Sequence, residues 1–117
     1  MIFIEHKALY NTFGPVPDVE RVVPIGPDAI TRSGTDATIV ANSRIVLAAE
    51  EVSIEAVDLR ALRPLDTATV LSSVRKVNRA VVVNEGWRTS GFGAEISALI
   101  AEEAFDCLDA PVARNLL

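Results

Sequence analysis

The sequence predicts an α/β fold, a three-layer α/β/α sandwich around a mainly parallel, mixed sheet of about five strands. Short apolar runs alternate along the chain with segments of helical periodicity, and this order is typical of parallel βαβ units with right-handed crossovers. The strongest strand signal is the β-branched run at residues 80–83, which is typical of a buried central strand.

The first 28 residues are predicted to lie outside the main domain. Residues 2–4 are a short apolar strand candidate, and residues 11–28 contain four prolines and two glycines, which indicates a linker. We therefore expect residues 1–28 to be the last strand and linker of a preceding domain, and residues 29–117 to be the domain described next.

The domain is predicted to open with a β-hairpin. Residues 29–32 and 37–41 are β-compatible runs on either side of a loop that contains Gly34. Residues 44–51 suit a helix and residues 53–59 a strand. The connection at 42–53 has only twelve residues, the lower limit for a parallel crossover. It is either naturally short or incomplete in this sequence.

Two later helices are predicted from caps and apolar stripes. Asp66 is placed to cap a helix at 67–77, and a second helix is expected at 92–105, followed by a strand at 111–114. The apolar stripes that predict these helices are Val70, Leu71, Val74 and Val77 in the first, and Ile96, Leu99, Ile100 and Ala104 in the second.

Composition excludes several functional classes. The 117 residues carry a net charge of −5, and the basic residues are scattered, so a nucleic-acid-binding surface is not expected. No apolar run is long enough for a transmembrane helix, and no membrane partner is expected. The mean hydropathy of +0.31 fits either a surface covered by other subunits or a core rich in Ala, Val and Leu. The single cysteine, Cys107, is expected to be a buried structural thiol.

A glycine-rich turn at residues 90–94 precedes the second helix. A helix N-terminus with free N–H groups favours anions, but Ile96 stands where the third glycine of a dinucleotide-binding motif would be. The favoured interpretation is a tight turn with close helix–sheet packing, and phosphate binding is the alternative.

Polar residues near the ends of strands are candidates for acid–base chemistry. Glu5, Asp58 and Glu85 are expected near the carboxyl ends of strands, where ligands of α/β sheets bind. Because Arg60 and Arg63 follow Asp58, a salt-bridged loop explains that carboxylate more simply. The only histidine, His6, has no partner placed by the sequence, so a catalytic triad or a histidine metal site is weakly supported.

Trp87 has two open interpretations. It follows Glu85 and Gly86 in a loop, where an exposed aromatic ring would anchor an interface. It could equally fold back onto the core.

Four segments in a fixed order carry a resemblance to a known family. They are IFIEHKALYNT at 2–12, SIEAVDLRALRPLD at 53–66, RAVVVNEGW at 79–87 and SGFGAEISALIAEEAFDCLDAPVAR at 90–114. Together they resemble the C-terminal, transketolase-like domain of the β-subunit of thiamine-diphosphate-dependent 2-oxo acid dehydrogenases, with the pyruvate enzyme most similar. Other thiamine enzymes with an equivalent domain, such as transketolase or deoxyxylulose-phosphate synthase, and a stand-alone interaction or anion-binding module are the alternatives.

The resemblance implies an assembly domain within an enzyme that decarboxylates a 2-oxo acid and transfers the acyl group to lipoamide. It implies thiamine diphosphate and magnesium in the parent enzyme, but no catalytic, cofactor-binding or metal-binding residue in this chain, which would be inactive alone. The implied partners are a second copy, an α-subunit and the dihydrolipoyl acyltransferase core. The implied location is the cytoplasm, or the mitochondrial matrix or plastid in a eukaryote. The candidate interface residues are Arg60, Arg63, Asp66, Glu85, Trp87, Arg88 and Phe92.

Overall fold

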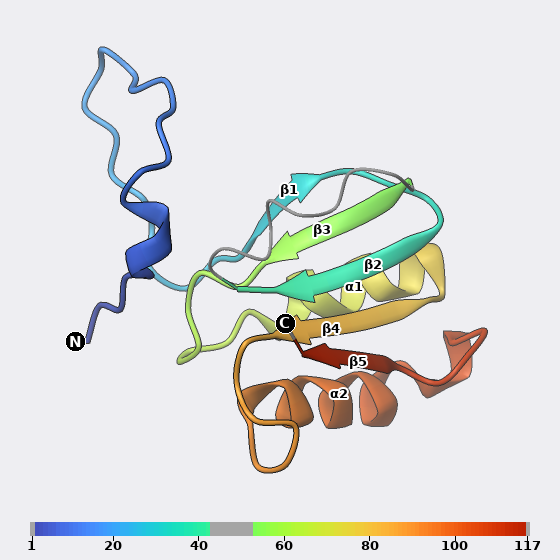
Figure 1. Cartoon of the computed structure of the whole chain (residues 1–117). Helices are drawn as coiled ribbons and strands as arrows, with labels where there is room; N and C mark the ends of the chain where they lie inside the picture. The colour runs from blue at the N-terminus through green and yellow to red at the C-terminus, as the bar shows by residue number, and fades with distance from the viewer. Residues whose placement is uncertain (1, 43–52, 117) are drawn as a thin grey trace.

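The computed structural model describes residues 2–42 and 53–116 as a five-stranded sheet, two α-helices and a long N-terminal arm, residues 2–27 (Figure 1). The strands are β1 (Ala29–Arg32), β2 (Ala37–Ala41), β3 (Ile54–Asp58), β4 (Ala80–Asn84) and β5 (Ala113–Leu116). The helices are α1 (Thr67–Val77) and α2 (Phe92–Glu103), with short 3-10 helices η1 (Lys7–Leu9) and η3 (Phe105–Cys107).

The sheet has the strand order β1-β3-β2-β4-β5. Strands β3, β2, β4 and β5 run parallel to one another, and only β1 is antiparallel, where it pairs with β3. The predicted α/β fold with a mainly parallel, mixed sheet of five strands is therefore confirmed.

The predicted hairpin between residues 29–32 and 37–41 is wrong. These residues form β1 and β2, but β3 lies between them and pairs with both. The turn that joins β1 to β2 instead contacts the beginning of β3, because the N–H groups of Thr35 and Asp36 both donate to the carbonyl of Ser53, at 3.0 and 2.9 Å. A Cβ on Gly34 would lie 2.3 Å from the Ile54 carbonyl carbon, so the turn closes over β3 only with glycine there.

Both described helices cover one face of the sheet (Figure 1). Their apolar stripes and the strand side chains of that face form the main core. Its members include Val40, Val57, Val70, Val74, Val82, Ile96 and Ile100. A smaller cluster on the other face contains the buried side chains of Ala41 and Val83.

The direction of the crossovers explains this arrangement. From β3 to β4 and from β4 to β5 the chain moves the same way across the sheet, and from β2 to β3 it moves the opposite way. Right-handed crossovers then place α1 and α2 on the same face of the sheet. Residues 43–52 of the β2–β3 connection, with the helix expected at 44–51 and most of the short crossover, lie outside the described residues.

Helix α1 matches its prediction. The Asp66 carboxylate accepts the Thr69 N–H at 3.1 Å and caps the helix, and the whole predicted stripe is buried. Asn78 ends the helix in the left-handed conformation, with φ of 62°, and its N–H returns to the Val74 carbonyl.

The C-terminal elements differ from the prediction in their limits. Helix α2 ends at Glu103 rather than 105, and Phe105 is 73% exposed in η3. Strand β5 spans residues 113–116 instead of 111–114, because Pro111 has no N–H with which to join the ladder. Cys107 is a free, half-buried thiol whose Sγ contacts the Ala104 carbonyl at 3.1 Å.

The strand expected at residues 2–4 is not a strand in the structure. Ile2, Phe3 and Ile4 are each more than 80% exposed, and no strand of the described residues pairs with them. A β-strand needs a neighbour for its backbone groups, and residues 2–42 and 53–116 offer none there.

Candidate functional site

The carboxyl ends of the parallel strands lie at one edge of the sheet and carry the loops that form the candidate site. These loops are residues 59–66, after β3, and residues 85–91, after β4 (Figure 1). We call the two loops and the first turn of α2 the carboxyl-edge surface. In the strand order, β2 is followed in the chain by its neighbour on one side, β3, and β4 by its neighbour on the other side, β5. Such a switch point between adjacent strands is where open α/β sheets place their functional sites.

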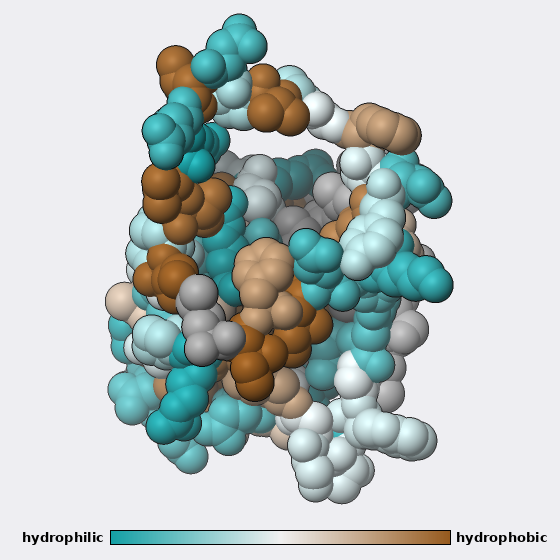
Figure 2. Space-filling view, turned by 90° about the vertical axis from the view of Figure 1, so that its left-hand side faces the viewer, coloured by the Kyte–Doolittle hydropathy of each residue, from teal (hydrophilic) through white to brown (hydrophobic). Residues whose placement is uncertain are grey.

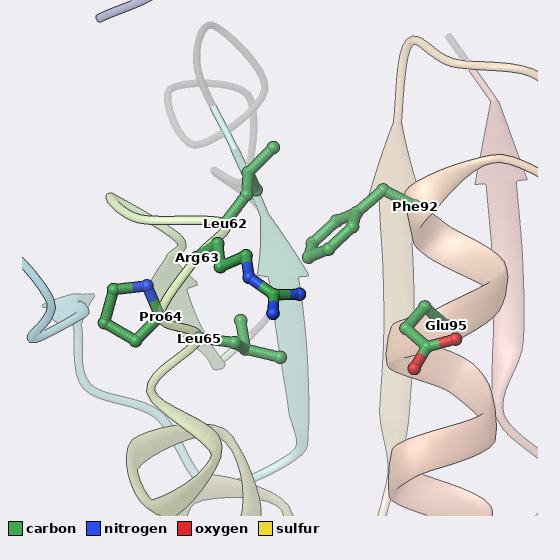
Figure 3. Close-up of a pocket in the computed structure, with 6 residues that line it drawn as sticks. All are labelled: Leu62, Arg63, Pro64, Leu65, Phe92 and Glu95. Atoms are coloured by element: carbon green, nitrogen blue, oxygen red, sulfur yellow. The ribbon is translucent and has the colours of Figure 1, made fainter. Parts of the chain in front are cut away.

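A pocket of about 520 Å³ opens on this surface between the β3–α1 loop and α2. It is lined by Leu62, Arg63, Pro64, Leu65, Phe92 and Glu95. Figure 3 shows Leu65 and Phe92 projecting towards each other from the two sides, with the Arg63 guanidinium in the space between them. The pocket therefore combines apolar walls with one cationic and one anionic side chain.

Trp87 points into solvent, which decides between its two interpretations. It is 87% exposed and does not fold onto the core. Arg88, beside it, is also exposed, and its carbonyl accepts the Arg114 guanidinium at 3.1 Å. The β4–α2 loop thus presents a large aromatic ring at the carboxyl-edge surface.

The glycine-rich turn is explained by close packing. A Cβ on Gly91 would lie 1.9 Å from the Trp87 carbonyl oxygen, and a Cβ on Gly93 would lie 3.0 Å from the Asn84 amide. Protein atoms already fill the space that a phosphate would need beside these glycines. This favours the tight-turn interpretation over phosphate binding.

Three aspartates connect the root of the arm to the β3–α1 loop. The Asp28 N–H donates to Asp66 at 3.1 Å, and the Asp28 carboxylate accepts the Arg60 N–H at 3.2 Å. The other oxygen of Asp28, Oδ2, is buried and has no hydrogen-bond partner within the described ranges. Asp58 pairs with the Arg60 guanidinium at 3.7 Å, which is the predicted salt-bridged loop.

The environment shifts the pKa of each aspartate. Burial raises the pKa of Asp28 to about 6 against the Arg60 hydrogen bond, and burial also raises the pKa of Asp58 against the attraction of Arg60. The side-chain and backbone hydrogen bonds from Thr69 hold the pKa of Asp66 below its ordinary value.

His6 and Glu85 form a contact that the sequence did not reveal. The His6 Nε2 lies 2.7 Å from the Glu85 carboxylate, and Nδ1 accepts the Ala8 N–H at 3.1 Å. Because Nδ1 is an acceptor, Nε2 carries the proton that is donated to Glu85. The pair joins the arm to the carboxyl-edge surface across 79 residues of sequence.

The structure brings the predicted interface residues together at one edge. Arg63 and Phe92 line the pocket, Trp87 and Arg88 are exposed in the β4–α2 loop, and Asp66 caps α1. Sequence reasoning missed Leu62, Leu65, Glu95 and Asp28. The exposed Leu62 beside Arg63 was an available signal, since an apolar residue in a charged loop suggests a contact surface.

Neither a metal site nor a membrane helix is found in residues 2–42 and 53–116. No group of three or more His, Cys, Asp or Glu side chains there is arranged to hold a metal ion. None of the helices in these ranges has the length and apolar character needed to cross a membrane.

Comparison with known proteins decides the family. The family described as "Transketolase, C-terminal domain" matches residues 28–117. The chain belongs to the transketolase C-terminal domain family. This match and the relatives named below confirm the resemblance drawn from the four sequence segments.

Relatives of this transketolase C-terminal domain include pyruvate dehydrogenase subunits. It is 45% identical to "Pyruvate dehydrogenase E1 component subunit beta, mitochondrial" of Dictyostelium discoideum, over 97% of this chain and 36% of the relative. It is 40% identical to the corresponding subunit of Rickettsia felis, over 96% of this chain and 37% of the relative. The chain thus spans about a third of the length of these curated relatives.

A solved structure shares the fold. "Split gene transketolase, inactive beta4 tetramer" aligns with a TM-score of 0.64 and 27% sequence identity, over 85% of this chain and 34% of that one.

The alignments with the Dictyostelium and Rickettsia subunits extend over 127 and 121 positions, more than the 117 residues of this chain. These two relatives therefore contain residues within the aligned region that this chain lacks.

Proposed function

We propose that this chain is the assembly domain of the β-subunit of a 2-oxo acid dehydrogenase of the pyruvate type, and that it has no turnover alone. The observation that carries the proposal is the carboxyl-edge surface, which combines the 87% exposed Trp87 with a pocket that has apolar walls and two charged side chains. Exposed aromatic and arginine side chains are the usual anchors of protein interfaces. The 45% identity to a pyruvate dehydrogenase β-subunit supports the choice of parent.

The parent reaction in this proposal is oxidative decarboxylation of a 2-oxo acid with transfer of the acyl group to lipoamide. Thiamine diphosphate and magnesium would be held by other domains, because the described residues do not fit them. The glycine turn at 91–93 is filled by Trp87 and Asn84, and residues 2–42 and 53–116 contain no cluster suited to a metal. In this proposal the chain therefore contributes no catalytic step.

We propose that residues 1–28 join this domain to a preceding one. The exposure of Ile2, Phe3 and Ile4 supports this, because a short extended apolar segment without a neighbour is stabilised when another sheet pairs with it. The match of the family to residues 28–117 is compatible with a boundary at this point.

The proposed partners are an α-subunit, a second copy of the chain and the acyltransferase core. The solved relative named as an inactive β4 tetramer supports self-association of β chains and their inactivity in that state. The proposed location is the cytoplasm or an organelle such as the mitochondrion, since one relative is named as mitochondrial.

The proposal is tested by sedimentation equilibrium and activity assays with and without thiamine diphosphate and magnesium. We expect no turnover and a mass that does not depend on cofactor, and we expect copurification with a pyruvate dehydrogenase α-subunit. A cofactor-dependent change in mass, or turnover by the chain alone, would overturn the non-catalytic assignment.

A second candidate is the equivalent domain of a transketolase-type enzyme. The 27% identity and the TM-score of 0.64 to a split-gene transketolase favour it over a stand-alone module. Copurification with a transketolase partner chain, and not with the dehydrogenase α-subunit, would select this candidate.

A further inference from the structure

The strand order of the sheet is not the order that the local sequence favours. Residues 29–32 and 37–41 suit a hairpin, yet β3 lies between β1 and β2 and pairs with both. The β1–β3 ladder alone holds β1 weakly, because β1 has four residues, one neighbouring strand and a register shift between Ile30 and Arg32. Interactions outside this ladder must therefore favour the insertion of β3.

A buried carboxylate lies where the β1–β2 turn passes the beginning of β3 (Figure 1). Glu55 of β3 is 1% exposed, and its Oε1 accepts the Ser73 hydroxyl of α1 at 2.7 Å. Its Oε2 pairs with the Lys76 ammonium and lies 3.5 Å from both the Ser33 hydroxyl and the Gly34 N–H of the turn. One carboxylate thus contacts α1 and the turn from its place on β3.

Further contacts connect the same groups. The Lys76 ammonium also donates to the Ser33 hydroxyl at 3.3 Å, so the cation reaches the turn as well as the carboxylate. In a β1–β2 hairpin, β3 would no longer lie beneath the turn, and Glu55 would lose both Ser33 and Gly34. A buried charge that keeps fewer donors is costly, and so is a buried N–H without an acceptor.

We propose that the Glu55 carboxylate holds the β1–β2 turn over β3 and thereby selects the inserted strand order over the hairpin. We call the residues of this network the Glu55 latch: Ser33, Gly34, Glu55, Ser73 and Lys76. Buried polar groups are known to fix register and partner choice in some folds, at a cost in stability. The inference goes beyond the proposed function, because it concerns the amino ends of the strands and not the carboxyl-edge surface.

The Glu55 latch also determines how β1 is attached. At its other end β1 follows Asp28, which is bound to the β3–α1 loop by hydrogen bonds with Arg60 and Asp66. The two ends of β1 are therefore held by separate polar contacts. Loss of the Glu55 latch is expected to free the end of β1 next to the turn, while the core on the helical face stays folded, which is a local opening.

Amide hydrogen exchange of the whole chain, read at single residues by NMR, is the first test. The variant E55M/K76M replaces the ion pair with unbranched apolar side chains, and such a replacement of both partners is often neutral for stability. The Thr35 and Asp36 N–H groups both bind the Ser53 carbonyl at the beginning of β3. We expect these two amides to exchange at least about tenfold faster in the variant, while the amides of α2 keep their rates.

The matched control is R79M/D109N, which removes an ion pair at the same end of the sheet. The Arg79 guanidinium and the Asp109 carboxylate lie 3.5 Å apart, and both side chains are more than half exposed. Neither side chain contacts the β1–β2 turn in the hydrogen bonds and ion pairs of the described residues. We expect the Thr35 and Asp36 amides of this variant to exchange as in the parent chain.

Nuclear Overhauser contacts report the strand order itself. Ile30 lies opposite Val57 in the observed sheet, whereas a hairpin with a four-residue loop at 33–36 would place it opposite Ile39. In E55M/K76M we expect the Ile30–Val57 contact to lose intensity and an Ile30–Ile39 contact to appear. The parent chain and R79M/D109N should show only the first contact.

Two results would overturn the inference. If the Thr35 and Asp36 amides of E55M/K76M exchange as slowly as in the parent chain, the turn does not depend on the carboxylate. If they exchange faster only in step with the amides of α2, the network contributes stability and does not select the strand order. Should E55M/K76M fail to fold, E55Q/K76M, which is closer in shape, carries the same expectation and is judged by the same two results. Copurification with an α-subunit remains an independent test of the proposed function.

Discussion

The carboxyl group of Asp28 is expected to make the stability of the domain depend on pH. Burial, with the neighbouring carboxylates of Asp66 and Asp58, raises its pKa to about 6 from an ordinary value of 3.8, although the Arg60 N–H opposes the shift. The folded chain therefore holds this proton more tightly than the unfolded chain does. The resulting stability is present below about pH 4 and is lost as the pH rises to about 6.

Asp28→Asn tests this dependence, because the amide keeps an oxygen for the Arg60 N–H but cannot ionise. At pH 7 we expect D28N to be more stable than the parent chain by about 1 kcal/mol, a value reduced for the partial exposure of the group. At pH 4 the two should be equally stable. Urea unfolding across this range measures the difference, with Asp18→Asn on the exposed arm as control. A D28N curve parallel to that of the parent chain would contradict the assignment.

Glu55 is a buried charge that depends on its partners. It is 1% exposed on β3, its carboxylate pairs with Lys76 of α1, and it accepts the Ser73 hydroxyl at 2.7 Å. Burial alone would raise the pKa of Glu55, but the hydrogen bonds from Lys76, Ser73 and Gly34 outweigh it and hold the pKa below its ordinary value. The carboxylate thus stays ionised inside the fold, where an unpaired charge is costly.

Lys76→Met is expected to destabilise the domain by about 3 kcal/mol, because it leaves the buried carboxylate without its cation. The double variant E55Q/K76M should lose less than K76M alone, since no buried charge remains. Guanidinium unfolding compares the three chains. Arg21→Met, on the exposed arm, is the control and should change stability by less than about 0.5 kcal/mol. Equal losses in K76M and the double variant would show that packing, not charge, is responsible.

At the scale of elements, the cap of α1 connects the helix, the β3–α1 loop that carries Asp66, and the root of the arm. The Asp66 carboxylate accepts N–H groups from Thr69 in the helix and from Asp28 at the root of the arm. We expect Asp66→Ala to cost about 1 to 2 kcal/mol, because both donors lose their acceptor. Thr67→Ala, at the exposed next position, is the control and should be nearly neutral. Circular dichroism during thermal unfolding measures both, and equal melting temperatures would exclude the cap as a stabilising feature.

The elements also show what sequence reasoning can reach. Local signals were sufficient for β4, for α1 with its Asp66 cap and for the stripe of α2, because each depends on residues close together in the chain. The hairpin prediction failed because turn chemistry says nothing about a third strand, and β3 enters between β1 and β2. Pairing order is a property of the whole sheet.

The candidate site was also predictable only where local sequence signals were sufficient. The predicted order of the strands was enough to place the loops at 59–66 and 85–91 at the same edge of the sheet. The exposure of Trp87 could not be predicted, since burial of a side chain depends on residues that are distant in the sequence. The pocket could not be predicted either, because its walls include Leu65 of the β3–α1 loop and Phe92 of α2, which are distant in the sequence. Whether the predicted residues form an interface stays a prediction until association is measured.

On the scale of the whole molecule, the arm leaves the carboxyl edge of the sheet and returns to it. His6 contacts Glu85 near one end of the arm, and Asp28 is bound to the β3–α1 loop at the other. Figure 2, which looks towards this side, shows the upper part of the arm standing clear of the rest with apolar groups in solvent. Two apolar residues of the arm, Phe13 and Val16, are 94% and 85% exposed. The two attachments therefore hold the arm while its apolar residues contribute no core.

The His6–Glu85 contact is expected to hold the first turn of the arm, at η1, against local unfolding, and to contribute little to the stability of the domain. His6→Asn keeps a side-chain acceptor for the Ala8 N–H but is too short to reach Glu85. A surface pair is worth at most about 1 kcal/mol, so we expect trypsin to cleave after Lys7 up to about fivefold faster. Cleavage after Arg21, in the exposed part of the arm, should keep its rate and serves as the internal control. Tyr10→Phe, which removes only the 3.1 Å contact with Glu5 inside the arm, is the matched variant. If both variants change Lys7 cleavage equally, the arm is held by its own turn and not by Glu85.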